Sequence, residues 1–348
     1  MKRNLFIGTA YVLALIVVIF NIQILFGNIF ISLILIILGL LTLIIGGDML
    51  VNGSSSLAIK YDIPPIVVGL TIVSFGTSAP ELVVSLLSAI KGNADLSISN
   101  VIGSNMINLL LILGISAYIY RIKVNKSTLH YEIPFSLISS VILFIIVNDR
   151  MISGASEDIL SRGDGLVLLS FFGVFMYYIY RLLRVGNIES EVEEISENST
   201  PRSLIFIILG MIGLYIGGKL TVEGSVFIAE SYGVSQMLIG ATIIGIGTSL
   251  PELVASVIAA LKKKSDIAIG NVIGSNIFNL LWILGLSGSI ININYNNQMN
   301  FDLILLTLAT CVLLLIIKFT KGHYISKKIG IGLILLYIFY LAVIIIRG

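Results

Sequence analysis

Residues 69 to 83 read GLTIVSFGTSAPELV and residues 240 to 254 read GATIIGIGTSLPELV, so one pattern returns after 171 positions. The segment NVIGSN at residues 100 to 105 returns at residues 271 to 276 with the same displacement. Self-similarity at a fixed displacement indicates that a chain contains copies of one structural unit. The sequence therefore predicts two copies of a unit, each with a glutamate directly after a proline.

The composition is that of a protein that lies mostly in lipid. Of the 348 residues, 57% are hydrophobic and only 11% are charged, whereas a soluble domain carries about 25% charged residues. Apolar runs of roughly 20 residues, the length that crosses a ~30 Å hydrocarbon layer as a helix, recur along the chain. We therefore expect an all-α polytopic membrane protein with spans near residues 5–25, 29–52, 63–90, 97–119, 129–148, 163–183, 203–225, 234–260, 268–290, 300–318 and 329–346.

The repeat divides these spans into a ten-helix core of two inverted five-helix repeats plus one extra N-terminal helix. Residues 1–28 hold the extra helix, residues 29–184 the first repeat, residues 185–202 a hydrophilic linker and residues 203–348 the second repeat. The first apolar stretch could instead be a signal peptide, but it is longer than the usual core of about 7–15 residues. We favour a retained helix.

The charges of the short loops orient the spans, because cytoplasmic loops are enriched in Lys and Arg. With the N-terminus in the cytoplasm, most of these residues, including Lys262, fall on that side. Five spans per repeat make the second copy cross in the opposite direction, so Lys91, the counterpart of Lys262, falls outside. We expect a multi-pass protein of the cell membrane with a cytoplasmic N-terminus, if the first helix is retained, a cytoplasmic linker and an extracellular C-terminus.

Glu81 and Glu252 lie within apolar runs, where a charged carboxylate costs about 2.5–3.5 kcal/mol on insertion scales. The alternative role is a carboxylate that is merely paired with a base, or protonated and packed, but neither helix has a Lys, Arg or His nearby. Pro80 and Pro251 interrupt the helix in front of each glutamate and free backbone carbonyls. Such breaks are tolerated in a membrane where protein or a cavity satisfies the backbone. We therefore predict that the two glutamates bind a cation.

Oxygen-bearing side chains share a helix face with each glutamate and continue on the next helix of each repeat. The candidate ligands besides the glutamates are Thr77 or Ser78, Thr248 or Ser249, and Ser104, Asn108, Ser275 and Asn279. For four neighbouring amides, both ligation and hydrogen bonding between helices stay open; these are Asn100, Asn105, Asn271 and Asn276.

Carboxylate, amide, hydroxyl and carbonyl oxygens are the ligands that Ca2+ prefers, and the same oxygens can hold Na+. Softer metals would need imidazole or thiolate ligands, but His130 and His323 fall at helix ends and the single Cys311 has no partner. We expect no cofactor, no enzymatic activity and no nucleic-acid partner; the partners are the lipid bilayer and the transported ions Ca2+ and Na+. The oligomeric state stays open, and a monomer is compatible with the sequence.

The segments GTSAPE at residues 76–81 and GTSLPE at residues 247–252, with the Gly-Ser-Asn segments that follow, resemble the α-repeats of the Ca2+/cation antiporter superfamily, in particular its prokaryotic Na+/Ca2+ exchangers. The resemblance covers about residues 29 to 346 and implies Na+ entry that drives Ca2+ extrusion. It makes Glu81 and Glu252 the central Ca2+ ligands, shared with Na+. It also assigns carbonyl ligands to Thr77 and Thr248, and Na+ sites on either side to Ser78, Ser249, Ser104 and Ser275.

Two departures bear on the coupling ion. Relatives that also move K+ carry an aspartate at a position matching Asn108 or Asn279, and the proton-coupled branch usually has a histidine after the glutamate, where Leu82 and Leu253 stand here. We therefore expect electrogenic Na+/Ca2+ antiport by alternating access. The alternatives are H+/Ca2+ exchange, K+-dependent Na+/Ca2+ exchange and, less favoured, a gated cation channel.

Overall fold

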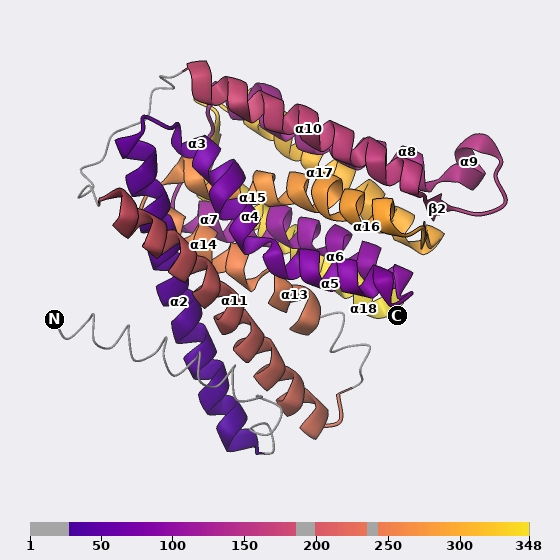
Figure 1. Ribbon diagram of the computed structural model, residues 1–348, viewed down its shortest axis with the longest axis horizontal. Helices are drawn as coiled ribbons and strands as arrows, with labels where there is room; N and C mark the ends of the chain where they lie inside the picture. The colour runs from indigo at the N-terminus through magenta and orange to yellow at the C-terminus, as the bar shows by residue number, and fades with distance from the viewer. Residues whose placement is uncertain (1–27, 186–198, 235–242, 348) are drawn as a thin grey trace.

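The computed structural model describes residues 28–185, 199–234 and 243–347, and these residues are almost entirely helical (Figure 1). The helix expected at residues 5–25 and most of the linker lie outside the described residues. Eight described helices are long and apolar enough to cross a membrane, and a bent pair raises the number to nine. This confirms the all-α polytopic fold, whereas the division into repeats at the stated boundaries stays a prediction.

The first half runs through α2 (Ile29–Lys60), α3 (Pro65–Val68), η2 (Gly69–Val73), α4 (Ser74–Thr77), α5 (Ala79–Ile90), α6 (Ala94–Met106), η3 (Ile107–Ile112), α7 (Leu113–Ile119), β1 (Ile122–Lys123), η4 (Thr128–Glu132), α8 (Ile133–Val147), α9 (Asp149–Ser153), β2 (Ile159–Leu160) and α10 (Arg162–Val185). The second half runs through α11 (Thr200–Ser231), α13 (Gly245–Thr248), α14 (Leu250–Leu261), α15 (Ser265–Ile277), η6 (Phe278–Ile283), α16 (Leu284–Ile290), β3 (Ile293–Asn294), η7 (Asn297–Met299), α17 (Asn300–Phe319), β4 (Tyr324–Ile325) and α18 (Lys327–Arg347).

The long helices α2 and α11 lie side by side and antiparallel, crossing the molecule diagonally in Figure 1. Glycines make this contact close: a β-carbon on Gly46 would lie 2.9 Å from the carbonyl oxygen of Gly210, and one on Gly217 would lie 2.7 Å from that of Gly39. Small residues let membrane helices approach backbone to backbone. Buried apolar residues, among them Leu50, join this pair to α3 and α14.

The helix that carries Glu81 is broken. The segments Pro65–Thr77 and Ala79–Ile90 meet at an angle of 49°, and Ser78 between them has φ −82° and ψ 8°, outside the helical region. Ser249 has nearly the same conformation, with φ −87° and ψ 6°, between α13 and α14. Proline is accommodated in the first turn of the helix after each break. The predicted interruption therefore leaves both glutamates in the first turn of a new helix.

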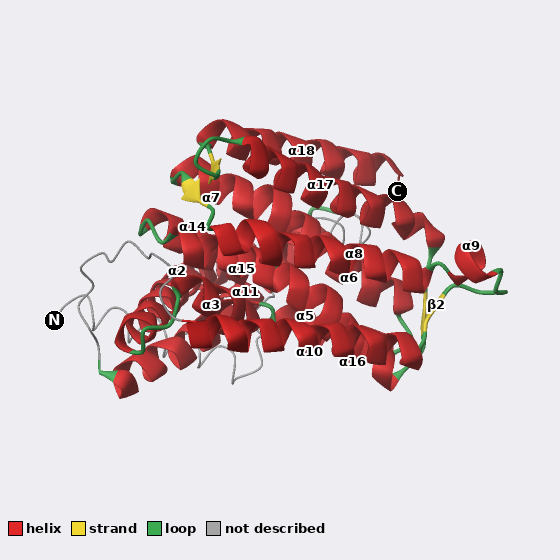
Figure 2. Cartoon of the chain, turned by 90° about the horizontal axis from the view of Figure 1, so that it is seen from above, coloured by secondary structure: helices red, strands yellow, loops and turns green. Residues whose placement is uncertain are grey.

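Two short antiparallel strand pairs join the halves of the chain. Strand β1 pairs with β4, with Ile122 opposite Ile325, and β2 pairs with β3, with Leu160 opposite Ile293. Figure 2 shows the two pairs at opposite ends of the helix bundle. Because Ile293 follows Ile122 by 171 residues, β1 and β3 are counterparts in the sequence repeat. The loop positions are thus related as an inverted repeat predicts.

Two spans are far more enclosed than the others. The apolar window of Ser265–Ile290 is 94% buried and that of Asp95–Ile119 is 72% buried, compared with 22% for Arg162–Arg184 and Lys327–Ile346. The enclosed spans contain the polar segments NVIGSN. Their amides and hydroxyls therefore face protein, where hydrogen bonds or ligands can satisfy them, and not lipid.

Candidate functional site

The ten residues predicted as ligands are all buried in the structure. They come from the two broken helices and from the two enclosed spans that follow them. We call them the central oxygen cluster: Thr77, Ser78, Glu81, Ser104, Asn108, Thr248, Ser249, Glu252, Ser275 and Asn279.

The two carboxylates are held crosswise by serines of opposite halves. Ser78 Oγ donates a hydrogen bond of 2.9 Å to Glu252 Oε1, and Ser249 Oγ lies 3.4 Å from Glu81 Oε1 as its donor. Ser104 Oγ is a third donor, 3.5 Å from Glu81 Oε1. Both glutamates are fully buried. Each break therefore presents its serine to the glutamate of the other break, which makes the two glutamates parts of one site.

Several buried oxygens of the cluster have no hydrogen-bond partner. They are Oε2 of Glu81 and of Glu252, Oγ of Ser275, and Oδ1 of Asn108 and of Asn279. Leaving a buried polar group unsatisfied costs about 1–3 kcal/mol, and more when the group is charged. A cation satisfies such oxygens when it binds within coordination distance of them.

The electrostatics of the cluster also favour a cation. Glu81 and Glu252 repel each other, and neither takes part in an ion pair within the described residues. The N-terminal ends of α5 and α14 supply only the partial positive charge of unpaired backbone N–H groups. If both glutamates are ionised, the site holds two buried negative charges that a bound cation would compensate.

The donor set suits a hard cation. In the described part of the chain, no three His, Cys, Asp or Glu side chains are grouped to hold a metal ion. The oxygens gathered here are those of two carboxylates and of neighbouring hydroxyl, amide and backbone groups, a mixture that Ca2+ and Na+ accept.

The broken helices also contact the enclosed helix α15 through Asn271. Thr77 Oγ1 donates to Asn271 Oδ1 over 3.1 Å, and Asn271 Nδ2 donates to Ser256 Oγ over 2.8 Å. The counterpart Asn100 donates in the same way to Ser85 Oγ, over 2.9 Å. Thr248, in contrast, has its hydroxyl 3.4 Å from a carbonyl of its own helix turn. Asn100 and Asn271 thus make the hydrogen bonds between helices that were one of their two predicted roles.

Asn105 and Asn276 connect the two enclosed spans to each other. Asn105 Nδ2 donates to the carbonyl oxygen of Asn276 over 3.2 Å, and Asn276 Nδ2 lies 3.4 Å from the carbonyl oxygen of Asn105. Asn279 Nδ2 donates to Asn105 Oδ1 over 2.9 Å. Asn105 and Asn276 thus make hydrogen bonds between helices, one of their two predicted roles, and Asn105 also holds the candidate ligand Asn279.

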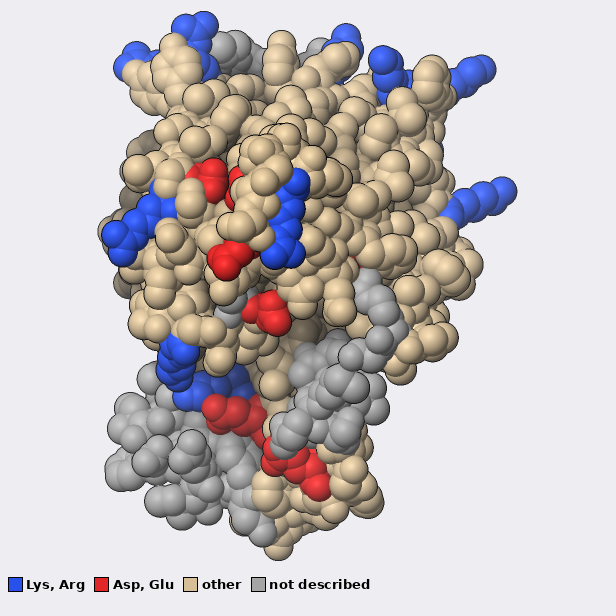
Figure 3. Space-filling model, turned by 90° about the vertical axis from the view of Figure 1, so that its right-hand side faces the viewer, with Lys and Arg blue, Asp and Glu red and all other residues tan. Residues whose placement is uncertain are grey.

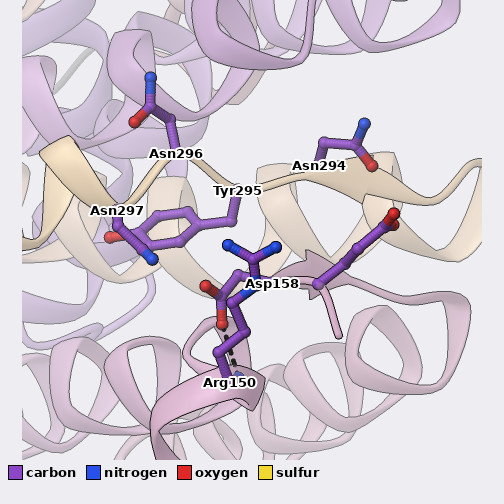
Figure 4. Close-up of a pocket in the computed structure, with 7 residues that line it drawn as sticks. Arg150, Asp158, Asn294, Tyr295, Asn296 and Asn297 are labelled. Carbon is purple, nitrogen blue, oxygen red and sulfur yellow. Dashed lines mark hydrogen bonds between the residues drawn. The ribbon is translucent and has the colours of Figure 1, made fainter. Parts of the chain in front are cut away.

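A surface hollow of about 460 Å3 lies elsewhere, beside the β2–β3 pair (Figure 4). At its lining, Asp158 Oδ1 accepts a hydrogen bond of 2.8 Å from the backbone N–H of Arg150, and Tyr295 Oη donates to Asn300 Oδ1 over 2.8 Å. Burial, and then the charges of Asp302 and Asp158, raise the pKa of Tyr295, so its hydroxyl stays protonated. Figure 3 shows this end of the molecule, where acidic side chains lie within a largely uncharged surface. No residue of the central oxygen cluster lines the hollow.

Comparison with known proteins identifies the relatives of this chain. The family model described as sodium/calcium exchanger protein matches residues 31–181 and 202–346. The putative antiporter CaxA of Alkalimonas amylolytica is 34% identical over 320 residues, which cover 88% of this chain and 96% of the relative. The sodium/calcium exchanger MaX1 of Methanosarcina acetivorans is 31% identical over 344 residues, covering 90% of this chain and 98% of the relative.

The solved structure of the sodium-calcium exchanger NCX_Mj, soaked with Na+ and Sr2+, superimposes with a TM-score of 0.77 at 31% identity and covers 90% of this chain and 99% of its own. Similarity over almost the whole length of both chains confirms the resemblance that was predicted for about residues 29 to 346. This chain is a membrane transport protein of the sodium/calcium exchanger family.

Proposed function

We propose that this chain exchanges Na+ for Ca2+ by alternating access, with Glu81 and Glu252 as the central ligands. The observation that carries the proposal is the crosswise pairing of Ser78 with Glu252 and of Ser249 with Glu81. A movement that separates the two broken helices would pull each serine away from the carboxylate it serves. Ion binding and helix arrangement are therefore energetically linked, which a transporter needs and a simple pore does not.

The remaining candidate ligands complete the proposed shell around the two carboxylates. Ser104, Asn108, Ser275 and Asn279 supply hydroxyl and amide oxygens from the enclosed spans. Thr77 and Thr248 stand directly before the helix breaks and supply backbone carbonyls, while Ser78 and Ser249 serve Na+. The proposed ions follow from this oxygen-only donor set.

Charge balance determines the expected current. The two glutamates compensate one Ca2+ or two Na+, so exchange at that ratio moves no net charge through the site. A third Na+ held by uncharged oxygens would make each cycle electrogenic. Four uncharged side chains, Ser104, Ser275, Asn108 and Asn279, are available for such an ion, and we propose electrogenic Ca2+ extrusion.

The test is Ca2+ uptake into proteoliposomes under separately imposed gradients. An outward Na+ gradient should concentrate radioactive Ca2+ inside the vesicles. The rate of Ca2+ uptake should change when a K+ gradient and a K+-selective ionophore set the membrane potential. Glu81→Gln and Glu252→Gln should each reduce uptake at least 100-fold, because each removes one of two charges that bind Ca2+. Glu223→Gln, which alters a partly exposed glutamate of α11 paired with Lys219, serves as the control.

If a pH gradient without Na+ drives uptake equally well, the coupling ion is H+ and not Na+. Downhill flux with no uphill accumulation would indicate a channel. Full activity of either glutamine variant would remove that glutamate from the site.

A further inference from the structure

A second fully buried carboxylate lies outside the central oxygen cluster. Glu132 is the last residue of η4, about one turn inside the apolar span Thr128–Val147, and its side chain is 0% exposed. Its Oε1 accepts a hydrogen bond from the hydroxyl of Tyr178 on α10. Its Oε2 has no hydrogen-bond partner. The proposed exchange mechanism does not use this group.

The surroundings of Glu132 contain hydroxyls and an acid. Thr128, one turn earlier on η4, is fully buried and its hydroxyl faces the Glu132 carboxyl. From the first turn of α15, Asp266 repels Glu132 and accepts a hydrogen bond of 2.9 Å from Asn125. Five other titratable groups on η4, on the loop before it and on the last turn of α17, which also packs against η4, have exposed side chains: Tyr131, His130, Lys123, Lys126 and Lys318. Asp302, in the first turn of α17, is buried and interacts with Tyr295.

These contacts determine which ligand the carboxyl can take. An ionised carboxylate buried without a counter-charge is costly, and a nearby acid increases the cost. A metal ion would need about six oxygens, whereas the described surroundings of Glu132 supply the two hydroxyls and one further carboxylate. A proton needs a single oxygen, and Glu132 Oε2 is the oxygen without a partner. Proton uptake converts the carboxylate to a neutral carboxyl and removes its repulsion from Asp266.

The backbone at Glu132 is also unusual. The π-helical turns η2, η3 and η6 belong to helices that carry the central oxygen cluster, and η4 is a fourth such turn. Single π-turns within α-helices are frequent at functional sites. The position 171 residues after Glu132 is Leu303, so the glutamate is not repeated at the matching position, although the buried Asp302 directly precedes Leu303. Glu132 lies at the end of the molecule where β1 pairs with β4.

We propose that Glu132 is a proton-binding site, separate from the ion-exchange site, through which pH at the β1–β4 end sets how η4 and the loop before it are held against Asp266 of α15. Helix α15 carries Asn271 and Ser275. A change in its packing at Asp266 would alter the rate at which the central oxygen cluster opens. The proton site stands on its own contacts, while its effect on transport rests on the proposed exchange function.

Infrared difference spectroscopy of the purified protein tests proton binding without any transport. The Glu81→Gln/Glu252→Gln background removes the carboxyls of the central oxygen cluster. In that background, a pH step between 5 and 9 should change a carboxyl C=O band, and adding Glu132→Gln should remove that change. Adding Glu223→Gln instead should leave it. A band change that survives Glu132→Gln would overturn the proposal, whether or not the protein exchanges Na+ for Ca2+.

The pH profile of Na+-driven Ca2+ uptake tests the effect on transport. Glutamine resembles the neutral carboxyl, so Glu132→Gln should behave at every pH as the unaltered protein behaves at low pH. Tyr178→Phe removes a hydrogen bond to the ionised form and should move the midpoint of the profile up by about one pH unit, and Asp266→Asn removes the repulsion and should move it down by about as much. A uniform loss of rate with an unchanged midpoint in these variants would reduce Glu132 to a packing residue.

Discussion

Ser78 donates a hydrogen bond of 2.9 Å to Glu252, a residue 174 positions further along the chain. Its counterpart Ser249 reaches Glu81 over 3.4 Å. The difference in length means that the two halves of the site are not equivalent in this structure. The Glu252 carboxylate is held by a well-formed hydrogen bond, whereas the Glu81 carboxylate has two weak ones from Ser249 and Ser104.

The first prediction concerns this inequality. Ser78→Ala should weaken Ca2+ binding about 10–100-fold, because a hydrogen bond to a charged group contributes about 1.5–3 kcal/mol. Ser249→Ala should have a smaller effect, since the bond it removes is longer. The Ca2+ dependence of Na+-driven uptake measures both. Ser88→Ala, at a buried serine of α5 outside the cluster, is the control, and equal effects of Ser78→Ala and Ser88→Ala would contradict the assigned role.

The second prediction concerns the inverted topology. In a Cys311→Ser background, Lys91→Cys should react with a membrane-impermeant maleimide added to intact cells, and Lys263→Cys should react only after the membrane is opened. Both positions are exposed in the structure and follow corresponding helices, α5 and α14. Labelling of both from the same side would refute the inversion. If Lys263→Cys is labelled in intact cells and Lys91→Cys only after the membrane is opened, the repeats are inverted but the predicted orientation of the protein in the membrane is wrong.

The third prediction concerns the contact between α2 and α11. A β-carbon on Gly46 would meet the backbone of Leu214 at 2.8 Å, so Gly46→Ala should force the helices apart and cost about 1–3 kcal/mol of stability. At Gly173 of α10, an added β-carbon meets nothing within 4 Å. Gly173→Ala should therefore leave the thermal midpoint in detergent unchanged or raise it slightly, since alanine is the better helix former. Equal midpoints for the two variants would show that the close contact is not tightly constrained.

The fourth prediction concerns charge at the cluster. Asn279→Asp adds a third buried carboxylate to a site whose two glutamates balance one Ca2+. We expect Ca2+ uptake by this variant to fall several-fold in the absence of K+ and to recover when K+ supplies the additional charge. Asn279→Ser, which adds no charge, should stay independent of K+. A K+-independent Asn279→Asp variant would show that this position does not contribute to the charge of the site.

Local sequence features predicted the parts of the molecule that depend on local physics. Apolar runs predicted the nine candidate spans of the described residues, counting the bent pair as one, whereas the predicted span at 5–25 and part of that at 234–260 lie outside them. Pro80 and Pro251 predicted the interruptions that the structure places at Ser78 and Ser249. The fold and the family are confirmed. The roles of the candidate ligands and the boundaries of the repeats stay predictions.

Relationships that depend on how helices meet could not be read from the sequence. Each serine bonds to the glutamate of the other half only because the two helix breaks face each other. The residues that share one face of a helix can be predicted from its sequence, but the face that a distant helix presents to them cannot. Glu132 was not predicted either, because it lies inside an apolar run near a polar loop and is not repeated at Leu303. Its burial becomes evident only when α10 brings Tyr178 against it.

The crosswise serine contacts also have a consequence for biosynthesis. A ribosome adds about 5–20 residues per second, so the 168 residues from Glu81 to Ser249 take roughly 8 to 34 s to synthesise. Throughout that interval, the first glutamate is already in the nascent membrane segment without the serine that will serve it. The first half of the chain must therefore wait, with its carboxyl protonated or solvated, for the second half to emerge. Assembly of the site is thus one of the last events in the production of the protein.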